Sequence, residues 1–341
     1  MKQPVSSQLS NPSQAALSPG DLRGVFLPIP TPFDSAGEVD LRALRANIAR
    51  WNATGISGYV ILGSTGERVH LDDREYLEVI GAAREGVATD DNELAFIVGA
   101  GQQSTRATVN EIKRVAAAVA VDALLVITPN FYRPSITPEA LIEHYERVAD
   151  ESPAPLILYS MPALTGITIE PETAARLSEH ENIIGIKDSS ADVAGLQETI
   201  KLVSKDFAVL TGNGTVLHQA LRAGAWGGIL AVGCVASAHC LAIVQAMRSG
   251  ETELAARLQS ALTPLAQAVT TRFGIGGLKA ALEMRGYVGG AVRAPLRAPD
   301  QEAREEIRRC LEDAEYETAM AQRAPGITDK QPGDFPYQRS G

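Results

Sequence analysis

The chain has 341 residues and a mass of 36.2 kDa, and 45% of its residues are hydrophobic, which is enough to bury one large core or two modest ones. It carries 31 Lys and Arg against 41 Asp and Glu, so its formal net charge is −10, and it has no block of basic residues. This composition argues against wholesale disorder and against sequence-independent binding to nucleic acid, which requires the opposite charge balance.

Eight short apolar runs are the main feature of the first two thirds of the chain. Residues 1–20 precede them, contain no apolar run of seven or more and are predicted to form a flexible tail. The runs are nearly continuous in Val, Ile and Leu, which is typical of parallel strands covered on both faces. They span residues 24–29, 58–62, 94–99, 123–128, 155–160, 183–187, 207–212 and 227–233.

The segments between these runs place apolar residues three and four apart, which is the spacing of an amphipathic helix. Thr137 followed by Pro138, for example, offers an N-cap and a proline at the first helical position. Helices are predicted at 41–51, 73–87, 104–119, 138–149, 171–177 and 196–203. After the last strand, helical periodicity continues over 241–248, 253–271, 278–285 and 301–314.

Eight strand–helix units in about 230 residues favour a closed barrel over an open doubly wound sheet, and no GxGxxG follows the first strand. We therefore predict an α/β fold, a (β/α)8 TIM barrel with a C-terminal helical region. That region could cap the barrel or mediate oligomerisation. The predicted divisions are a flexible N-terminal tail (1–20), a catalytic barrel (21–235), the helical region (236–321) and a flexible C-terminal tail (322–341).

Cysteines and histidines give no sign of a disulfide framework or a metal site. Cys234, Cys240 and Cys310 are widely spaced without a CxxC motif, and the five histidines form no HxH or HxxxH pair. No stretch of about 18 uncharged apolar residues occurs, which a membrane span would require. We therefore expect a cytoplasmic protein with reduced thiols, no metal ion and no membrane contact.

Lys187 ends the apolar run 183–187, where an unused lysine would be costly. Active sites of (β/α)8 barrels lie at the carboxyl ends of the strands, so the barrel prediction places this lysine at the active-site end. Desolvation there would lower the pKa of its ammonium group and free the amine to form a Schiff base with a ketone. The structural alternative is a lysine that extends out of the barrel or pairs with Asp188.

Three hydroxyl groups end other strands of the predicted barrel. Tyr159 ends the run before Lys187, where its phenol could donate to a carbonyl oxygen or transfer a proton. Ser64 and Thr65 lie in a glycine-flanked turn whose hydroxyl and backbone N–H groups suit a carboxylate. A rim tyrosine and a helix-capping turn are the structural alternatives. Chance is less able to explain Lys187 and these three hydroxyl groups together at one end of the barrel than any one of them alone.

Five ordered motifs carry a resemblance to a known family. They are GSTGE (63–67), TPNFYRPS (128–135), YSMPALTG (159–166), GIKDSS (185–190), and FGIGGLKAALEMRGYVGG (273–290) with RAPL (293–296). The sequence resembles the dihydrodipicolinate synthase and N-acetylneuraminate lyase superfamily over roughly residues 22–315. The resemblance implies a (β/α)8 barrel, commonly a homotetramer, whose lysine forms a Schiff base with pyruvate or another 2-keto acid and which needs no metal or organic cofactor.

The resemblance also implies a role for each matching residue. Lys187 would form the Schiff base, Tyr159 would transfer protons, and Ser64 would relay protons to that phenol. A protonated imine is an electron sink, so the C3–C4 bond of a 4-hydroxy-2-keto acid can break and leave a pyruvate enamine. The substrate-binding positions would be Thr65, Ser189, Gly212 and Ile229.

Two positions depart from the family pattern. Where the lysine-biosynthetic synthases carry an arginine that binds a substrate carboxylate, this sequence has Leu164, which cannot form that charge-assisted pair, worth about 1.5–3 kcal/mol. A different acceptor or another anchor is implied. Where the family usually places a tyrosine that crosses a subunit interface, this sequence has Phe131. Tyr132 follows it but would point the other way on an extended segment.

The motifs most resemble the 4-hydroxy-2-oxoglutarate aldolase branch. The leading hypothesis is therefore a class I aldolase that cleaves 4-hydroxy-2-oxoglutarate to pyruvate and glyoxylate through an imine on Lys187. The alternatives within the superfamily are a 4-hydroxy-tetrahydrodipicolinate synthase and a 2-keto-3-deoxy sugar acid aldolase or dehydratase. A catalytically silent keto-acid-binding relative, supported by Phe131 alone, is the alternative of another class. The expected partners are a small 2-keto acid and further copies of the chain, as a dimer or tetramer.

Overall fold

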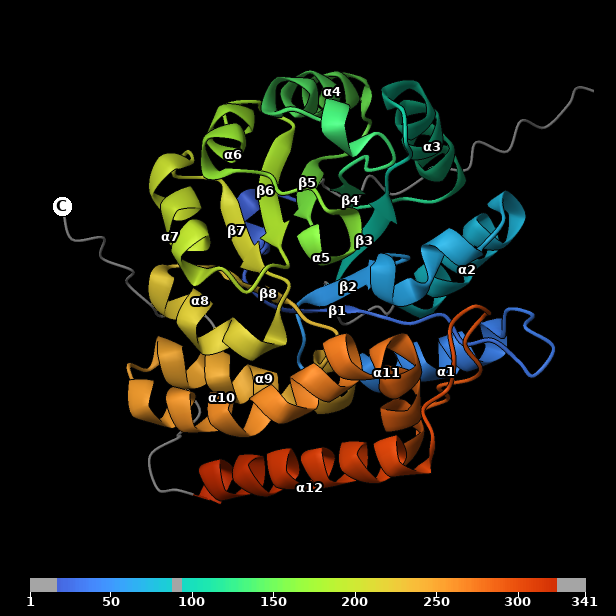
Figure 1. Cartoon of the computed structure of the whole chain (residues 1–341), viewed down its shortest axis with the longest axis vertical. Helices are drawn as coiled ribbons and strands as arrows, with labels where there is room; N and C mark the ends of the chain where they lie inside the picture. Colours follow the sequence, from blue (N-terminus) through green and yellow to red (C-terminus); the bar gives the residue numbers. More distant parts are fainter. Residues whose placement is uncertain (1–16, 88–93, 324–341) are drawn as a thin grey trace, which may run out of the picture.

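The computed structural model describes residues 17–87 and 94–323. In this part of the chain, eight parallel strands form a closed barrel in sequence order, and the last strand pairs with the first (Figure 1). The prediction of a (β/α)8 TIM barrel is therefore confirmed. The strands are β1 (Gly24–Pro28), β2 (Gly58–Ile61), β3 (Ala95–Ala100), β4 (Ala123–Ile127), β5 (Leu156–Ser160), β6 (Ile183–Asp188), β7 (Ala208–Thr211) and β8 (Gly227–Ile229).

Twelve α-helices accompany these strands within the described residues. Most of the predicted helices are found with ends shifted by a few residues, but the one predicted at 241–248 begins at Gly233 and the one predicted at 301–314 ends at Arg323. The short α5 and α8 are additional. The helices are α1 (Leu41–Trp51), α2 (Asp73–Val87), α3 (Thr105–Ala118), α4 (Pro138–Glu151), α5 (Pro162–Thr165), α6 (Pro171–Leu177), α7 (Val193–Leu202), α8 (Leu217–Ala223), α9 (Gly233–Arg248), α10 (Thr252–Gln267), α11 (Gly274–Met284) and α12 (Gln301–Arg323).

The strands are buried on both faces, which explains their continuous apolar sequences. Alternate side chains of one strand join two different clusters. In β1, for example, Phe26 belongs to the cluster inside the barrel, whereas Val25 and Leu27 pack between the strands and the helices. The last apolar run is an exception, because only its first three residues form β8 and Gly233 already begins α9.

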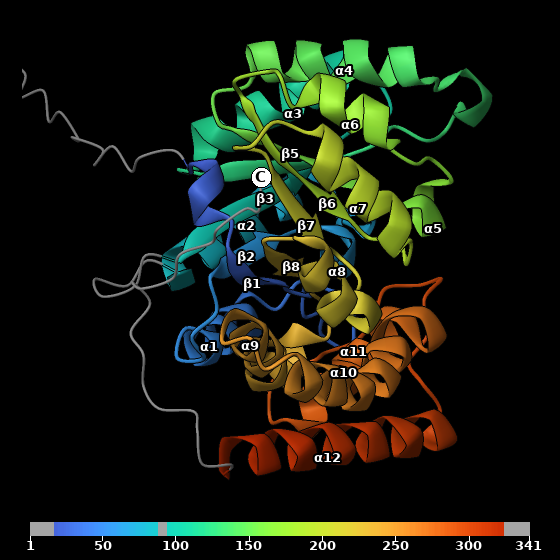
Figure 2. The same ribbon diagram turned by 90° about the vertical axis from the view of Figure 1, so that its left-hand side faces the viewer.

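The C-terminal helices α9 to α12 lie along one side of the barrel, with α12 as the outermost layer (Figures 1 and 2). The predicted division at 235/236 falls inside α9, where Ala236 has non-helical backbone angles. The predicted tails lie mostly outside the described residues, although α12 reaches Arg323. None of the described helices combines the length and apolar character needed to cross a membrane.

Candidate active site

Lys187 lies near the carboxyl end of β6, and only 3% of it is exposed. It stands directly beside Tyr159 of β5 in the strand register, and its Nζ lies 4.1 Å from the centroid of the Tyr159 ring. The Asp188 carboxylate accepts instead from the backbone N–H of Ser190. Lys187 thus neither extends into solvent nor pairs with Asp188, so the structural alternatives for this lysine do not hold.

Ser64 and Tyr159 form the contact expected of a proton relay, since Ser64 Oγ lies 2.9 Å from Tyr159 Oη. Burial raises the pKa of the Tyr159 phenol. The positive charge of Lys187 and hydrogen bonding to Ser64, Lys187 and Ser189 outweigh this effect, so the pKa lies below its usual value. A phenol with a lowered pKa gives up its proton more readily near neutral pH.

Removing only the Tyr159 hydroxyl is expected to slow turnover without preventing imine formation. Tyr159→Phe keeps the ring beside Lys187 but removes the hydroxyl that is predicted to transfer protons, so kcat is expected to fall by about 10²–10⁴-fold. Borohydride trapping of pyruvate should still label the variant. Tyr316→Phe, at an exposed tyrosine of α12, is the control. Unchanged kcat in Tyr159→Phe would remove the phenol from the mechanism.

Ser64 and Thr65 lie in a single turn of 3-10 helix, η2 (Ser64–Gly66), that follows β2. Thr31, after β1, donates its hydroxyl to the carbonyl of Gly66 over 2.7 Å and so holds this turn against the neighbouring strand end. Thr31 is a residue that sequence reasoning did not single out. Its position two residues after the apolar run 24–29 was the only signal that pointed to it.

Glu67 ends this turn in a left-handed backbone conformation with φ 53°. Its carboxylate pairs with Lys279 of α11 over 2.6 Å and also accepts from the backbone N–H of Arg293. Both side chains of the Glu67–Lys279 pair are almost completely buried. Because these partners come from the C-terminal region, that region holds the Ser64–Thr65 turn in place.

Ser189 and Gly212 adjoin the lysine, whereas Ile229 is fully buried in the interior cluster that also contains Tyr159. A Cβ atom at position 212 would overlap Ser189 Oγ and would lie 2.7 Å from Lys187 Cε. Glycine is therefore needed at this strand end because of close packing around the lysine side chain.

Gly212→Ala is expected to fold normally but to form the pyruvate adduct slowly. Residue 212 does not have a positive φ, so the added methyl group strains no backbone but displaces the end of the Lys187 side chain. Misplacing a reacting group by about 1 Å can cost about 10²-fold in rate, and we expect a loss of that order in pyruvate adduct formation. Gly81→Ala on α2, where a Cβ meets no atom within 4 Å, is the matched control. Wild-type adduct formation in Gly212→Ala would contradict this packing argument.

The two positions that depart from the family pattern are exposed. Leu164 in α5 is 64% exposed, and Phe131 and Tyr132 are 75% and 69% exposed. The segment around Phe131 and Tyr132 is a turn that leads into the 3-10 helix η4 (Arg133–Ser135), so the expectation of an extended segment was wrong. The two rings contact each other edge to face, with centroids 5.0 Å apart.

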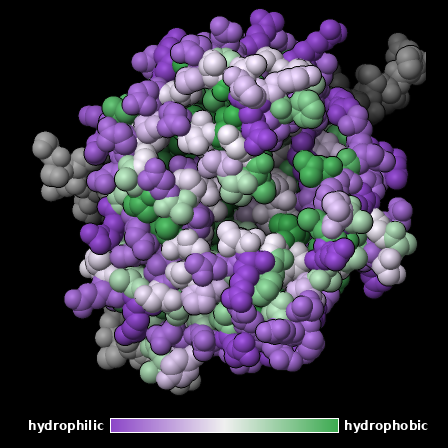
Figure 3. Space-filling view, in the orientation of Figure 1, coloured by the Kyte–Doolittle hydropathy of each residue, from purple (hydrophilic) through white to green (hydrophobic). Residues whose placement is uncertain are grey.

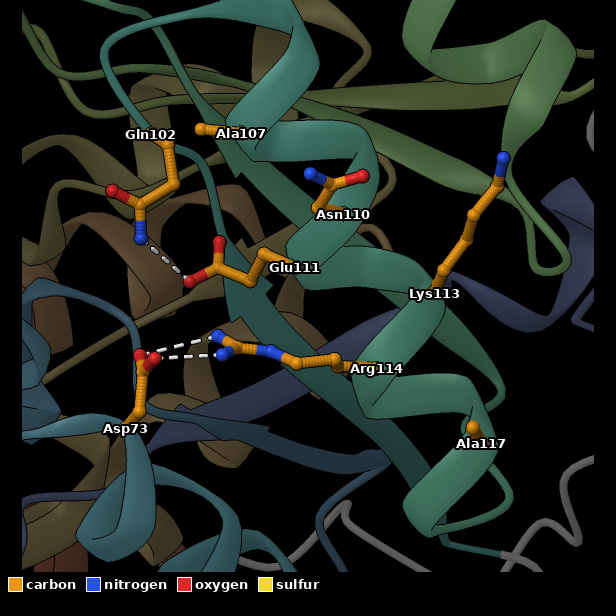
Figure 4. Close-up of a pocket in the computed structure, with 8 residues that line it drawn as sticks. All are labelled: Asp73, Gln102, Ala107, Asn110, Glu111, Lys113, Arg114 and Ala117. Carbon is orange, nitrogen blue, oxygen red and sulfur yellow. Dashed lines mark hydrogen bonds and ion pairs between the residues drawn. The ribbon is translucent and has the colours of Figure 1, made fainter.

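Two other surface features of the described part of the chain are the face shown in Figure 3 and a groove beside α3. In Figure 3, hydrophobic and weakly polar residues gather near the centre of the face seen in Figure 1, and hydrophilic residues predominate at its edge. A groove beside α3 contains none of the predicted site residues (Figure 4). Four of its polar side chains pair with one another, since Arg114 pairs with Asp73 and Gln102 donates to Glu111. No group of three or more potential metal ligands occurs within residues 17–87 and 94–323.

Comparisons with known proteins match most of this chain to one family. The model of the dihydrodipicolinate synthetase family matches residues 21–314. A 4-hydroxy-tetrahydrodipicolinate synthase from Methanothrix thermoacetophila is 34% identical over 290 residues, which cover 85% of this chain and 96% of that protein.

Solved structures show the same likeness. A monomeric dihydrodipicolinate synthase variant superposes with a TM-score of 0.81 and 29% identity over 86% of this chain and 97% of its own. A prophage protein of the dihydrodipicolinic acid synthase family from E. coli K12, solved in complex with pyruvate, has a TM-score of 0.79 and 28% identity, with 86% of this chain and 99% of its own covered.

Proposed function

The chain belongs to the dihydrodipicolinate synthetase family of pyruvate-dependent Schiff-base lyases, and we propose that it joins pyruvate, bound as an imine on Lys187, to aspartate semialdehyde. The observation that carries this proposal is the position of Lys187, which is buried and stands beside Tyr159 in the strand register. The product would be 4-hydroxy-tetrahydrodipicolinate. This reaction is the one in the name of the 34% identical relative.

The first half of the proposed reaction forms a nucleophile from pyruvate. The Lys187 amine, once it has given up a proton, attacks C2 of pyruvate, and the oxygen of that carbonyl leaves as water to give an imine. Loss of a proton from C3 then yields an enamine, and the imine nitrogen takes up the electron pair. Thr65, buried in the turn after β2, and the backbone N–H groups of that turn would bind the pyruvate carboxylate.

The second half forms and then releases the product. C3 of the enamine attacks the aldehyde carbon, and Tyr159 donates a proton to the new alkoxide. The proton lost earlier from C3 returns to Tyr159 through Ser64. The amino group of the second substrate then attacks C2 and displaces the Lys187 amine, which closes the ring. One water is released overall, and the lysine is regenerated.

Cleavage of 4-hydroxy-2-oxoglutarate, the leading hypothesis from the sequence, becomes the second candidate. The relatives named above support the synthase alternative and not this aldolase. One observation still favours the aldolase, since exposed Leu164 replaces the arginine that the synthases use to bind a carboxylate. Both reactions would share the imine on Lys187 and the relay from Tyr159 to Ser64.

Turnover of the two substrates by the wild-type enzyme distinguishes the candidates. If it is the synthase, kcat/KM for pyruvate with aspartate semialdehyde should exceed that for 4-hydroxy-2-oxoglutarate cleavage by at least about tenfold. Weak activity with aspartate semialdehyde that Leu164→Arg rescues would favour the aldolase. Failure of borohydride to trap pyruvate on the wild-type enzyme would leave the catalytically silent relative as the better hypothesis.

We also propose that the enzyme is a cytoplasmic homo-oligomer. Two exposed aromatic rings, Phe131 and Tyr132, suit a contact between subunits. Cys234 and Cys240 are buried free thiols, which fits a reducing compartment. Light scattering at micromolar concentration tests this proposal, and a monomeric mass would contradict it. A monomer is a realistic outcome because one solved relative is a monomeric variant.

A further inference from the structure

We propose that the guanidinium group of Arg133 binds the carboxylate of the aldehyde substrate and so performs the task that Leu164 cannot. The inference rests on the proposed function, because both candidate reactions involve an aldehyde that carries a carboxylate. It concerns which aldehydes the enzyme accepts, and it leaves the chemistry at Lys187 unchanged.

Arg133 lies against the turn that contains Leu164, although the two residues are far apart in the sequence. A Cβ atom at position 166 would lie 2.8 Å from Arg133 Nη1 and 2.9 Å from its Cδ. The side chain thus runs across Gly166, which ends α5 with φ 67°. The helix α5 begins three residues after Tyr159, and both views place it beyond the end of β5 (Figures 1 and 2). The charge missing at Leu164 is therefore supplied at the same turn from another loop.

The Arg133 guanidinium is available to a ligand. It forms no hydrogen bond or ion pair with the part of the chain that the structure describes, and the residue is exposed. Other basic side chains around the Ser64–Thr65 turn and its C-terminal supports are paired with carboxylates. The pairs are Arg68 with Glu111, Lys279 with Glu67 and Arg293 with Glu75. A planar, unpaired guanidinium suits a carboxylate because it can donate two parallel hydrogen bonds.

The loop that carries Arg133 is held in place. The side-chain oxygen of Gln103 accepts from the backbone N–H groups of Asn130 and Phe131 over 2.9 and 2.8 Å. Arg133 then begins η4, in which Pro134 restricts the backbone. On the other side, Thr165 Oγ1 donates to the Met161 carbonyl and so closes the turn of α5. Arg133 therefore lies between two ordered segments, which limits the entropy lost when it binds a carboxylate.

The test compares Arg133→Gln with Arg133→Lys and with a control, Arg147→Gln, at an exposed arginine of α4. Arg133→Gln is expected to raise KM for aspartate semialdehyde, or for 4-hydroxy-2-oxoglutarate if that is the substrate, by about 10–100-fold. The KM of Arg133→Lys should lie between those of the wild type and Arg133→Gln, since an ammonium group carries the charge but cannot donate two parallel hydrogen bonds to a carboxylate. Activity with propionaldehyde, which has no carboxylate, and borohydride trapping of pyruvate should match the wild type in all three variants.

A rescue variant separates a direct contact from a structural role. Adding Leu164→Arg to Arg133→Gln returns a guanidinium to the same turn and should restore most of the affinity for the carboxylate-bearing substrate. The inference is overturned if Arg133→Gln leaves that KM unchanged, or if it impairs propionaldehyde and the carboxylate substrate equally. A wild-type enzyme that forms no pyruvate adduct would instead refute the proposed function itself.

Discussion

Lys187→Ala is expected to abolish formation of the pyruvate adduct and to lower kcat by at least about 10⁴-fold, the scale of loss when a covalent nucleophile is removed. The lysine is buried, and its Nζ lies 4.1 Å from the centroid of the Tyr159 ring. Intact-protein mass spectrometry after borohydride reduction with pyruvate measures the adduct directly. Steady-state assays with whichever of the two candidate substrates the wild-type enzyme turns over measure kcat.

Two further variants make the Lys187 result specific. Lys187→Arg keeps a positive charge near Tyr159 but provides no amine able to form an imine, so it should be as inactive as alanine. Lys201→Ala, at an exposed lysine of α7, should retain the adduct and full activity. An adduct that persists in Lys187→Ala would move the Schiff base to another lysine and contradict the proposed mechanism.

Lys279→Met is expected to lower the free energy of unfolding by about 3–5 kcal/mol, because it removes the lysine that pairs with the buried carboxylate of Glu67 and leaves it with the contacts to His70 and the Arg293 backbone N–H. The Glu67 side chain is 1% exposed and the Lys279 side chain 2%. Glu67 also has a left-handed backbone conformation that its contacts must maintain. Urea unfolding followed by circular dichroism measures the loss. Turnover should fall as well, since this pair holds the turn that carries Ser64 and Thr65.

A double-mutant cycle tests whether the two charges act as a pair. Glu67→Gln combined with Lys279→Met removes both charges and should recover part of the lost stability relative to Lys279→Met alone. The exposed pair Lys201–Glu198 is the control, and Lys201→Met should cost less than about 1 kcal/mol. Equal losses from the buried and the exposed pair would contradict the role assigned to Glu67 and Lys279.

Much of the barrel could be predicted because its signals are local. A parallel strand covered on both faces requires a continuous apolar run, and an amphipathic helix requires apolar residues three and four apart. The helices 41–51 and 73–87 therefore have the predicted bounds. The last run was misleading, because the apolar residues after Ile229 belong to a turn and to α9, which are also buried.

The sequence by itself determined the fold class, the family and the residues that gather around Lys187. A strand end is recognisable from its own residues, and a closed parallel barrel brings all such ends together, so Lys187, Tyr159 and Ser64 could be predicted as neighbours. Only the tertiary structure decided that Lys279 reaches Glu67 and that Arg133 lies across Gly166. These contacts join segments far apart in the chain, and they depend on how the C-terminal helices and the loops pack against the barrel, which no local pattern of hydrophobicity encodes.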